Sequence, residues 1–173
     1  MQSIARTVML GAAMDTITVE YSEVNGADFL CYRASQMIPE ELWGPNFKHN
    51  AMDIFETADV VYVAHIDEEV IGCICLTRFQ GCPDDPGNME GWARCWYLKP
   101  EYRGQRIGLH LLELVIKYAK RHPNFYKRYI FAENVGDFLK KVNEAPNKVL
   151  VDRARSIARA DGSKLDIYWI WLG

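Results

Sequence analysis

The feature that most constrains this chain is a turn with two glycines that joins a strand-like run to an amphipathic helix. The run "WARCWYLKP" ends at Pro100 and has the aromatic and apolar content of a β-strand. The stretch "YRGQRIGLHLLELVIKYAKR" then crosses the turn, and apolar residues recur at helical spacing from Ile107. The first turn of a helix leaves backbone N–H groups unpaired and carries the positive end of the helix dipole. A strand, a turn and a helix start in this order predict an anion-binding cradle.

The residues of the turn suit such a cradle. Gly104 and Gly108 have no Cβ atom that would keep a phosphate away from the backbone. Arg103 and Arg106 supply positive charge that a diphosphate needs. Short glycine motifs also occur by chance, so the alternative is an ordinary strand-to-helix turn with two solvated arginines.

Length and composition indicate one globular domain. The chain has 173 residues, of which 49% are apolar and 25% are charged, and such a chain can bury a sizeable core. Its formal net charge of -3 gives no general attraction to nucleic acid or to an anionic membrane. The chain has five cysteines, which is an odd number, and it is large enough to fold without disulfides. We therefore predict reduced thiols and a cytoplasmic location.

The amino terminus is expected to be an extension. Residues 1–15 contain an apolar run that is broken by Thr7 and Gly11 and is too short to span a membrane. We expect this end to be frayed or docked. Residues 16–173 show no repeat, low-complexity tract or long linker, and we expect them to form a single domain.

Periodicity and turn residues predict the order of the elements. Strands are expected over 16–24, 59–67, 69–79, 92–100, 128–134 and 165–172, with a hairpin at Asp67-Glu68-Glu69. Helices are expected over 26–38 with Asn25 as N-cap, in two short pieces within 39–57 split at Gly44-Pro45, from Ile107 to a stop at Pro123, and over 135–144. Residues 147–162 are of uncertain type.

On these residues the chain resembles the GCN5-related N-acetyltransferases, the GNAT superfamily. Their signature is Arg/Gln-x-x-Gly-x-Gly/Ala directly after a strand that usually ends near a proline, and "YLKPEYRGQRIGLHLL" is similar to it. Arg103 and Gly108 match the first and last signature positions, whereas Arg106 stands where a glycine is usual. An arginine with helical backbone at this point would still present its N–H group. The resemblance is strongest over residues 92–121, and the element order follows the family's plan over most of the chain.

The resemblance implies an α/β (α+β) fold of the GNAT type. Its central mixed, mostly antiparallel sheet would have six to seven strands, splayed at the cofactor cleft and flanked by about four helices, and residues 16–173 would form one acyltransferase domain. The resemblance also implies acetyl-CoA as co-substrate. Its pyrophosphate is expected on the loop formed by Arg103, Gly104, Gln105, Arg106, Ile107 and Gly108.

The strand before this loop is expected to hold the pantetheine arm. By the resemblance, the backbone of Tyr97, Leu98 and Lys99 pairs with that arm as an added strand would, and an N–H group near Leu98 donates to the thioester carbonyl. Asn134 ends the next strand, where the family often has an asparagine close to the cofactor or the acceptor. Capping of the following helix is the alternative role for Asn134, and the two roles are compatible.

The acid and the base of the expected reaction are the least defined groups. Attack of an amine on a thioester needs a neutral amine and a proton for the leaving thiolate. The family often has a tyrosine some residues after the asparagine, but Lys141 stands there, and Tyr126 or Tyr129 would have to substitute. Glu90 is the carboxylate nearest to the cofactor strand, and it is the candidate base, acting through a water.

The acceptor is expected to be a primary amine. The loop over 80–91 carries Asp84, Asp85 and Glu90 and no basic residue, so it would attract a cationic amine if it lies beside the acceptor. That amine belongs to a small molecule, or to a lysine or the amino terminus of a protein. The expected enzyme has no membrane partner, and a homodimer is compatible with the sequence.

Other functions stay open. A catalytically silent acyl-CoA-binding or regulatory protein would keep the loop without the acid and base, and a plain interaction module would bind no CoA. A nucleic-acid-modifying acyltransferase would use the basic, aromatic segment 117–129, which is also typical of a solvated helix end. Cys95, on the cofactor strand, is a candidate nucleophile. The cysteines and histidines have no zinc-site spacing, so we expect no metal.

Overall fold

The computed structural model describes residues 3–10, 15–40, 47–80, 89–122, 129–133, 151–158, 162 and 164–173. Within these residues the chain forms eight β-strands and three α-helices. They fall into two compact units, one made of Met1–Thr77 with Cys95–Lys117 and the other of Arg78–Arg94 with Tyr118–Gly173.

The first unit is built on four antiparallel strands in the order β1-β2-β3-β4. Their bounds are Ser3–Leu10, Asp15–Val24, Val60–Ile66 and Glu69–Gln80. The register pairs Ile66 with Glu69, which makes β3 and β4 a tight hairpin. Asp67 begins its turn with a φ of 50°, and such turns require a positive φ. The predicted hairpin is therefore confirmed.

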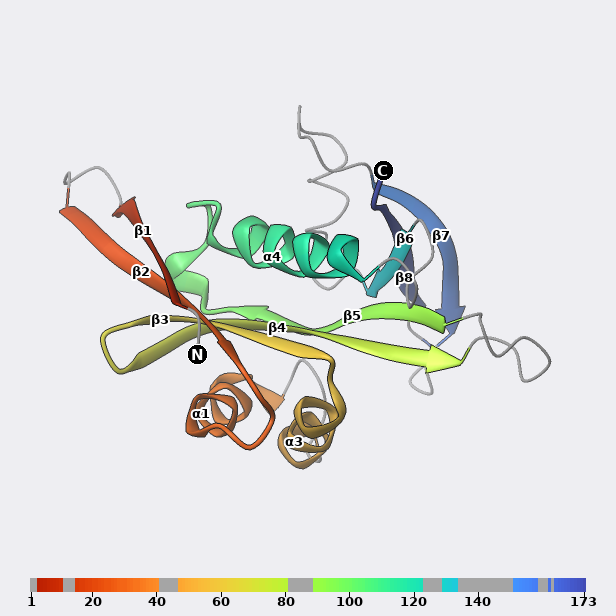
Figure 1. Cartoon of the computed structure of the whole chain (residues 1–173), viewed down its shortest axis with the longest axis horizontal. Coiled ribbons are helices and arrows are strands. Elements are labelled where there is room, and N and C mark those ends of the chain that lie inside the picture. The colour runs from red at the N-terminus through yellow and green to blue at the C-terminus, as the bar shows by residue number, and fades with distance from the viewer. Residues whose placement is uncertain are drawn as a thin grey trace. The chain divides into compact units, whose positions relative to one another are not determined.

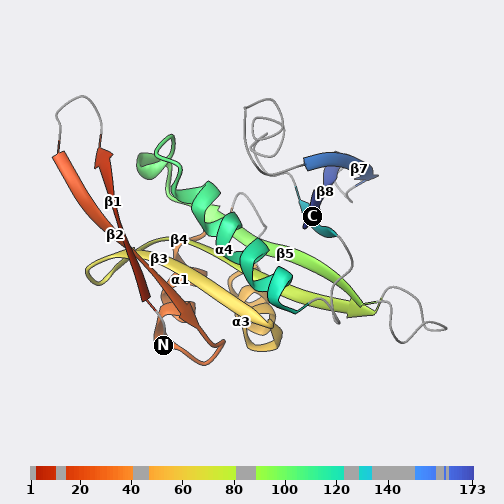
Figure 2. The same ribbon diagram turned by 45° about the horizontal axis from the view of Figure 1, so that its top comes forward.

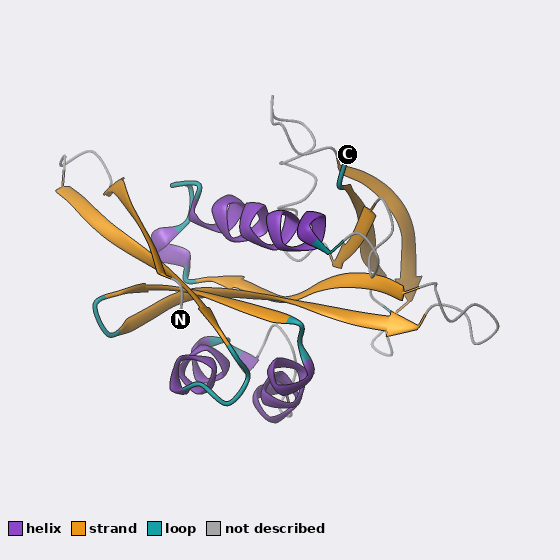
Figure 3. Cartoon of the chain, in the orientation of Figure 1, coloured by secondary structure: helices purple, strands orange, loops and turns teal. Residues whose placement is uncertain are grey.

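Helices cover both faces of this sheet. α1 (Phe29–Met37) and α3 (Phe47–Thr57) lie on one side, and α4 (Ile107–Arg121), which belongs to this unit up to Lys117, lies on the other (Figure 1, Figure 2 and Figure 3). Buried apolar residues on the side of α1 and α3 form one cluster, which includes Cys31, Ala34, Phe55, Val63 and Cys73. The helix predicted from Ile107 is confirmed.

The start of α1 differs from the predicted one. Asp28 is the N-cap residue, and its Oδ1 accepts a hydrogen bond from the N–H of Leu30 at 2.9 Å. The prediction that Asn25 caps this helix was wrong, because Asn25 Oδ1 accepts from the N–H of Ala27 at 3.1 Å. Asn and Asp both favour such local bonds, and Asp28 is the one next to the helical residues.

The strands of the second unit follow the order β5-β6-β8-β7. Their bounds are Met89–Leu98, Tyr129–Glu133, Lys164–Trp171 and Val151–Ala158. β5 and β6 run parallel, and β8 runs antiparallel to both β6 and β7. Aromatic rings pack against one another across β5, β6 and β8, namely those of Trp92, Tyr129, Phe131, Trp169 and Trp171. β5 continues into the first unit at Cys95.

The predicted fold class is confirmed, because the strands form a mixed and mostly antiparallel sheet with helices packed on it. The expected extension over 1–15 contains β1, so the described strands exceed the six to seven expected. Polar residues break the apolar pattern of β1, but β2 pairs with it along its whole length. β7 lies in the run of uncertain type. Residues 41–46, which include most of the first helical piece predicted within 39–57 and its split at Gly44-Pro45, lie outside the described residues, as does the helix predicted over 135–144. The division into 1–15 and 16–173 stays a prediction.

Candidate functional site

The loop between β5 and α4 has the backbone of an anion cradle. A short 3-10 turn, Pro100–Tyr102, leads into it, and α4 begins at Ile107. Gly104 has a φ of 83° and Arg106 a φ of 63°, whereas the φ of Gln105 between them is not positive. Backbone N–H groups that are exposed in a turn next to a helix start can bind an anion.

The start of α4 adds further donors to this loop. The N–H of His110 donates to the carbonyl of Arg106 at 2.9 Å. The N–H groups of the turn before His110 are those that every helix leaves without an intrahelical acceptor, and they lie at the positive end of the helix dipole. No atom of the described chain comes within 4 Å of the position that a Cβ would take on Gly104. An anion can therefore approach the backbone at this residue.

Arg106 adopts a conformation that is unusual for its residue type. A left-handed φ costs an L-residue about 1 to 2 kcal/mol relative to glycine, and Arg106 has a φ of 63°. The expected helical backbone at this position is therefore not observed. The glycine that the signature usually has here would meet the same φ without strain.

Arg103 connects the loop to the end of β5. Its Nε donates to the carbonyl oxygen of Leu98 at 3.0 Å, and its guanidinium lies 5.7 Å from the ring centroid of Tyr97. Tyr97 is 6% exposed. Burial raises the pKa of the Tyr97 phenol, and the positive charge of Arg103 opposes this rise. The first residue of the loop thus contacts two of the residues expected to hold the cofactor.

The backbone at the end of β5 faces two directions. The N–H of Lys99 donates to the carbonyl of Ile71 on β4 at 2.9 Å, and the Lys99 ammonium pairs with Glu69. Successive residues of a strand present their backbone groups to opposite edges. Leu98 therefore directs its N–H and carbonyl away from β4. Tyr97, Leu98 and Lys99 are expected to meet the pantetheine arm, and of these Leu98 is the one whose N–H points away from β4.

Two contacts that the sequence analysis missed support this end of β5. The indole N–H of Trp96 donates to the carbonyl of Gly108 at 3.2 Å, which links the strand to α4. A Cβ on Gly72 of β4 would lie 2.9 Å from Leu98 Cδ1 and 3.1 Å from the carbonyl oxygen of Tyr97. A glycine inside an apolar strand run is a known sign of close backbone approach. The sequence carries no comparable signal for Trp96.

Cys95 interrupts the regular geometry of β5. Its φ is 51°, and an irregular residue of this kind bends and twists a strand as β-bulges do. The parallel ladder with β6 comprises Gly91 to Ala93, just before it. Cys95 is 4% exposed, and its carbonyl accepts a bond from the thiol of Cys73. A buried thiol is a poor nucleophile, which argues against the covalent role considered for Cys95.

The remaining predicted site residues are spread along the chain. Glu90 is the second residue of β5 and belongs to the second unit. Tyr129, considered as an acid, packs against the rings of Trp169 and Trp171 on β8. Outside the described residues lie Asp84, Asp85, Tyr126, Asn134 and Lys141.

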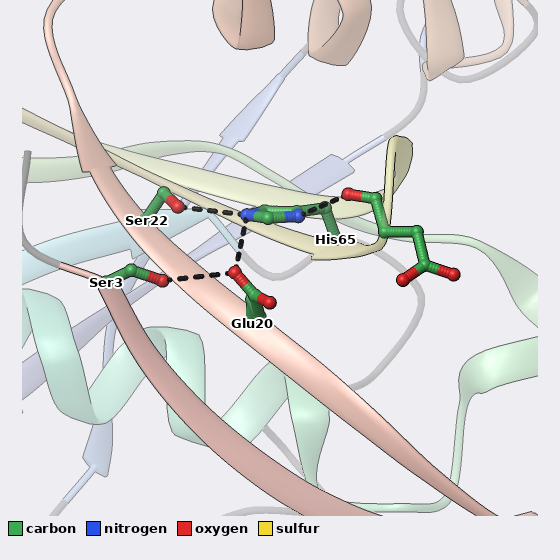
Figure 4. Close-up of polar contacts among 5 residues, drawn as sticks. Ser3, Glu20, Ser22 and His65 are labelled. Atoms are coloured by element: carbon green, nitrogen blue, oxygen red, sulfur yellow. Dashed lines mark hydrogen bonds and ion pairs between the residues drawn. The ribbon is translucent and has the colours of Figure 1, made fainter.

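A serine–histidine pair on β2 and β3 forms a second polar cluster (Figure 4). His65 Nδ1 donates to the carbonyl of Asp67 at 2.9 Å, so Nε2 accepts a bond from the hydroxyl of Ser22, also at 2.9 Å. Glu20 lies 4.0 Å from the same nitrogen and accepts a bond from Ser3. Ser22 is 0% exposed, so a substrate does not reach its hydroxyl. The cluster holds β1, β2 and β3 together.

The described part of the chain contains neither a metal-binding cluster nor a membrane-spanning helix. No group of three or more His, Cys, Asp or Glu side chains there could hold a metal ion. Its four cysteines, Cys31, Cys73, Cys75 and Cys95, are buried thiols. Burial raises the pKa of the Cys31 thiol to about 12. No helix in these residues is long and apolar enough to cross a bilayer.

The fold is similar to solved acetyltransferase structures. A GNAT-family protein from Desulfovibrio desulfuricans matches with a TM-score of 0.65 and 14% identity, over 90% of this chain and 99% of that chain. Aminoglycoside 6'-acetyltransferase type Ii matches with a TM-score of 0.64 and 12% identity, over 88% and 97%. Arabidopsis thaliana Naa50, in complex with the bisubstrate analogue CoA-Ac-MVNAL, matches with a TM-score of 0.57 and 17% identity, over 86% and 97%. At these identities the likeness is one of fold.

The amino-acid sequence supplies the family. No curated protein matches it at a significant level. It does match the acetyltransferase (GNAT) family over residues 28–138, which is more than half of the chain and includes β5, the Arg103 to Gly108 loop and α4. By this acetyltransferase domain the chain is an acyltransferase, and it belongs to the acetyltransferase (GNAT) family.

Proposed function

We propose that this enzyme transfers an acetyl group from acetyl-CoA to a primary amine. The observation that carries the proposal is the loop before α4, where Gly104 and Arg106 have left-handed φ values and a helix begins at Ile107. Its exposed backbone and the positive end of α4 suit a pyrophosphate. Arg103 and Arg106 add positive charge to the same loop.

Acetyl-CoA supplies the acetyl group in activated form, as a thioester. The residues fit its pyrophosphate because the space next to Gly104 is open and both arginines of the loop are exposed. The complex of Naa50 with CoA-Ac-MVNAL supports CoA chemistry on a similar fold. We therefore assign the pyrophosphate to Arg103, Gly104, Gln105, Arg106, Ile107 and Gly108.

The pantetheine arm is assigned to the end of β5. Leu98 directs its N–H away from β4, and its carbonyl is bonded to Arg103, the first residue of the loop. Leu98 therefore lies next to the proposed pyrophosphate site. The whole pantetheine arm separates the pyrophosphate from the thioester. For this reason we assign Leu98 to the arm, and we revise the sequence expectation that its N–H donates to the thioester carbonyl.

Transfer forms one bond and breaks another. The amine loses its proton, and its nitrogen attacks the thioester carbonyl carbon, so a C–N bond forms and the C–S bond breaks. The sulfur leaves as a thiolate and takes up a proton. Glu90, through a water, is proposed as the base that receives the amine proton. Asn134 is proposed to contact the cofactor or the acceptor.

The proposal of an amine as acceptor rests on the negative charge of one loop. The loop over 80–91 has three acidic residues and no basic one, and an acidic surface concentrates cationic amines. Structures of similar fold include an aminoglycoside acetyltransferase and a protein bound to CoA-Ac-MVNAL. The proposal accordingly covers amines of small molecules and the lysine or terminal amines of proteins.

Two measurements test the proposal. Calorimetry should detect binding of acetyl-CoA, and Gly108→Asp should abolish it in a protein whose circular dichroism is unchanged, because the added carboxylate repels phosphate. A thiol-release assay should then find turnover with at least one member of a panel of polyamines, aminoglycosides and lysine or amino-terminal peptides. A folded wild type that binds no acetyl-CoA would contradict the proposal. Binding without release from any amine would instead identify a silent acyl-CoA-binding protein.

A further inference from the structure

We infer that Arg103 is a positioning residue that holds the Leu98–Lys99 peptide so that Leu98 faces the pantetheine arm. The inference rests on the proposed function, because it concerns the same site. It assigns the Nε donor of Arg103 to the Leu98 carbonyl, whereas the proposed pyrophosphate site uses the positive charge of the same side chain. The two roles can be told apart, because positioning needs only an N–H donor, whereas phosphate binding needs a positive charge.

The Leu98–Lys99 peptide is bonded on both sides. On the side of β4, the N–H of Lys99 donates to the carbonyl of Ile71 at 2.9 Å. On the opposite side, Nε of Arg103 donates to the carbonyl of Leu98 at 3.0 Å. A planar peptide that is bonded through both its N–H and its C=O cannot rotate without losing one bond. Leu98 belongs to β5, and in a strand the N–H and C=O of one residue point to the same edge, so the direction of the Leu98 N–H follows that of its carbonyl.

Arg103 itself is held in place by two other contacts. Its backbone N–H donates to the carbonyl of Pro100 at 3.1 Å. Its guanidinium lies 5.7 Å from the ring centroid of Tyr97, a distance at which a cation is attracted to the ring face. Tyr97 is buried, so its ring is a fixed surface. The side chain of Arg103 therefore turns back toward β5. Its Nε–H group donates to the carbonyl of Leu98, so this donor is not available to a phosphate.

Three substitutions separate the donor from the charge. The Nε2 atom of glutamine stands as many bonds from Cα as the Nε atom of arginine, so Arg103→Gln keeps an N–H donor and removes the charge. Arg103→Lys keeps the charge but has a methylene group at that position. Arg103→Met has neither. If Arg103 positions the peptide, Arg103→Gln should retain more of the wild-type function than Arg103→Lys. If Arg103 binds phosphate, Arg103→Lys should retain more than Arg103→Gln.

The first test uses S-acetylpantetheine, which has the arm and the thioester but no phosphate. With an amine that the wild type accepts, kcat/KM for S-acetylpantetheine should stay near the wild-type value in Arg103→Gln. It should fall about 10-fold in Arg103→Lys and in Arg103→Met, as expected for the loss of one hydrogen bond that orients the arm. Lys120→Gln, which removes one positive charge from the last turn of α4, is the control and should change nothing. Equal values in all three Arg103 variants would overturn the inference.

The second test needs no turnover. Amide hydrogen exchange at Lys99 in the unliganded protein should be faster in Arg103→Lys and Arg103→Met than in the wild type, and unchanged in Arg103→Gln. Unchanged exchange in every variant would show that the bond does not hold this peptide, and it would overturn the inference. A wild type that releases no thiol from acetyl-CoA would refute the proposed function instead. Faster exchange together with unaltered use of S-acetylpantetheine would refute the positioning role.

Discussion

The rings of Tyr21 and His110 meet edge to face with their centroids 4.5 Å apart, between β2 and α4. His110 Nδ1 donates to the carboxylate of Glu113 at 3.2 Å. Neither the hydroxyl of Tyr21 nor Nε2 of His110 has a hydrogen-bond partner among the described residues, and both atoms are buried. A buried polar atom without a partner costs about 1 to 3 kcal/mol of stability. This contact is therefore a place where a polar atom can be removed at little cost.

Tyr21→Phe is expected to leave the free energy of unfolding unchanged or to raise it by up to about 1 kcal/mol, because the ring contact stays and the unpartnered hydroxyl goes. The matched control is Tyr62→Phe, since the Tyr62 hydroxyl donates to Glu23 at 2.9 Å. That variant should lose about 1 kcal/mol. Urea unfolding measures both. A clear loss in Tyr21→Phe would mean that its hydroxyl has a partner such as an ordered water.

The free energy of unfolding of the wild type should also fall at high pH, because the phenol of Tyr21 ionises more readily in the unfolded chain. Burial raises the pKa of Tyr21 to about 12, with Glu113 adding to the rise and Arg6 opposing it. A raised folded pKa gives stability that is present below the unfolded value of about 10 and is lost as pH rises toward the folded pKa. Between about pH 9 and about pH 11, the wild type should lose about 1 kcal/mol more than Tyr21→Phe. Urea unfolding at both pH values tests this, and parallel losses would contradict it.

The sequence predicts those parts of the fold that depend on periodicity and on turn residues. The hairpin at Asp67 and the helix from Ile107 are examples, because alternation, helical spacing and flanking polar residues act locally. The start of α1 was misplaced because Asn25 and Asp28 are both good caps, and which of them precedes the helix depends on the packing of the chain.

The sequence predicts which segment of the chain forms the site, but it does not predict the contacts between the residues of that segment. The loop from Arg103 is found from its glycines and the following helix. The bond from Arg103 to Leu98 was missed, because side-chain direction depends on how β5 and the loop pack together. The left-handed φ values of Cys95 and Arg106 were missed for a related reason. Sequence rules expect glycine at such φ values, and neither residue gives that signal.

Arg106→Gly and Arg106→Ala test the strained backbone of the loop. At a left-handed φ glycine is favoured, so Arg106→Gly should be more stable to urea than Arg106→Ala by about 1 kcal/mol. In a helical backbone the order would be reversed by a similar amount. Calorimetry should show weaker acetyl-CoA binding in both variants, because both lose the guanidinium. Greater stability of the alanine variant would contradict the observed φ of 63°.

Gly72→Ala tests the close approach of β4 to the cofactor strand. The new Cβ would lie 3.1 Å from the carbonyl oxygen of Tyr97 and 2.9 Å from Leu98 Cδ1. The leucine side chain can move, but the backbone of β5 must shift. We expect a loss of about 1 to 3 kcal/mol in the free energy of unfolding, together with weaker binding of acetyl-CoA. Unaltered affinity in the destabilised variant would place the cofactor away from Leu98.

Glu90→Gln tests the chemistry. Carboxylates near an amine favour its charged form, and the amine must lose a proton before it attacks, so turnover should rise with pH as the amine or its base titrates. If Glu90 is the base, the variant should lower kcat roughly 10- to 1000-fold and change acetyl-CoA binding little, because a base acts in the transition state. Thiol release across a pH series, with calorimetry as control, separates these quantities. Near-normal kcat with a raised KM for the amine would mean that water is the base and that Glu90 only attracts the acceptor.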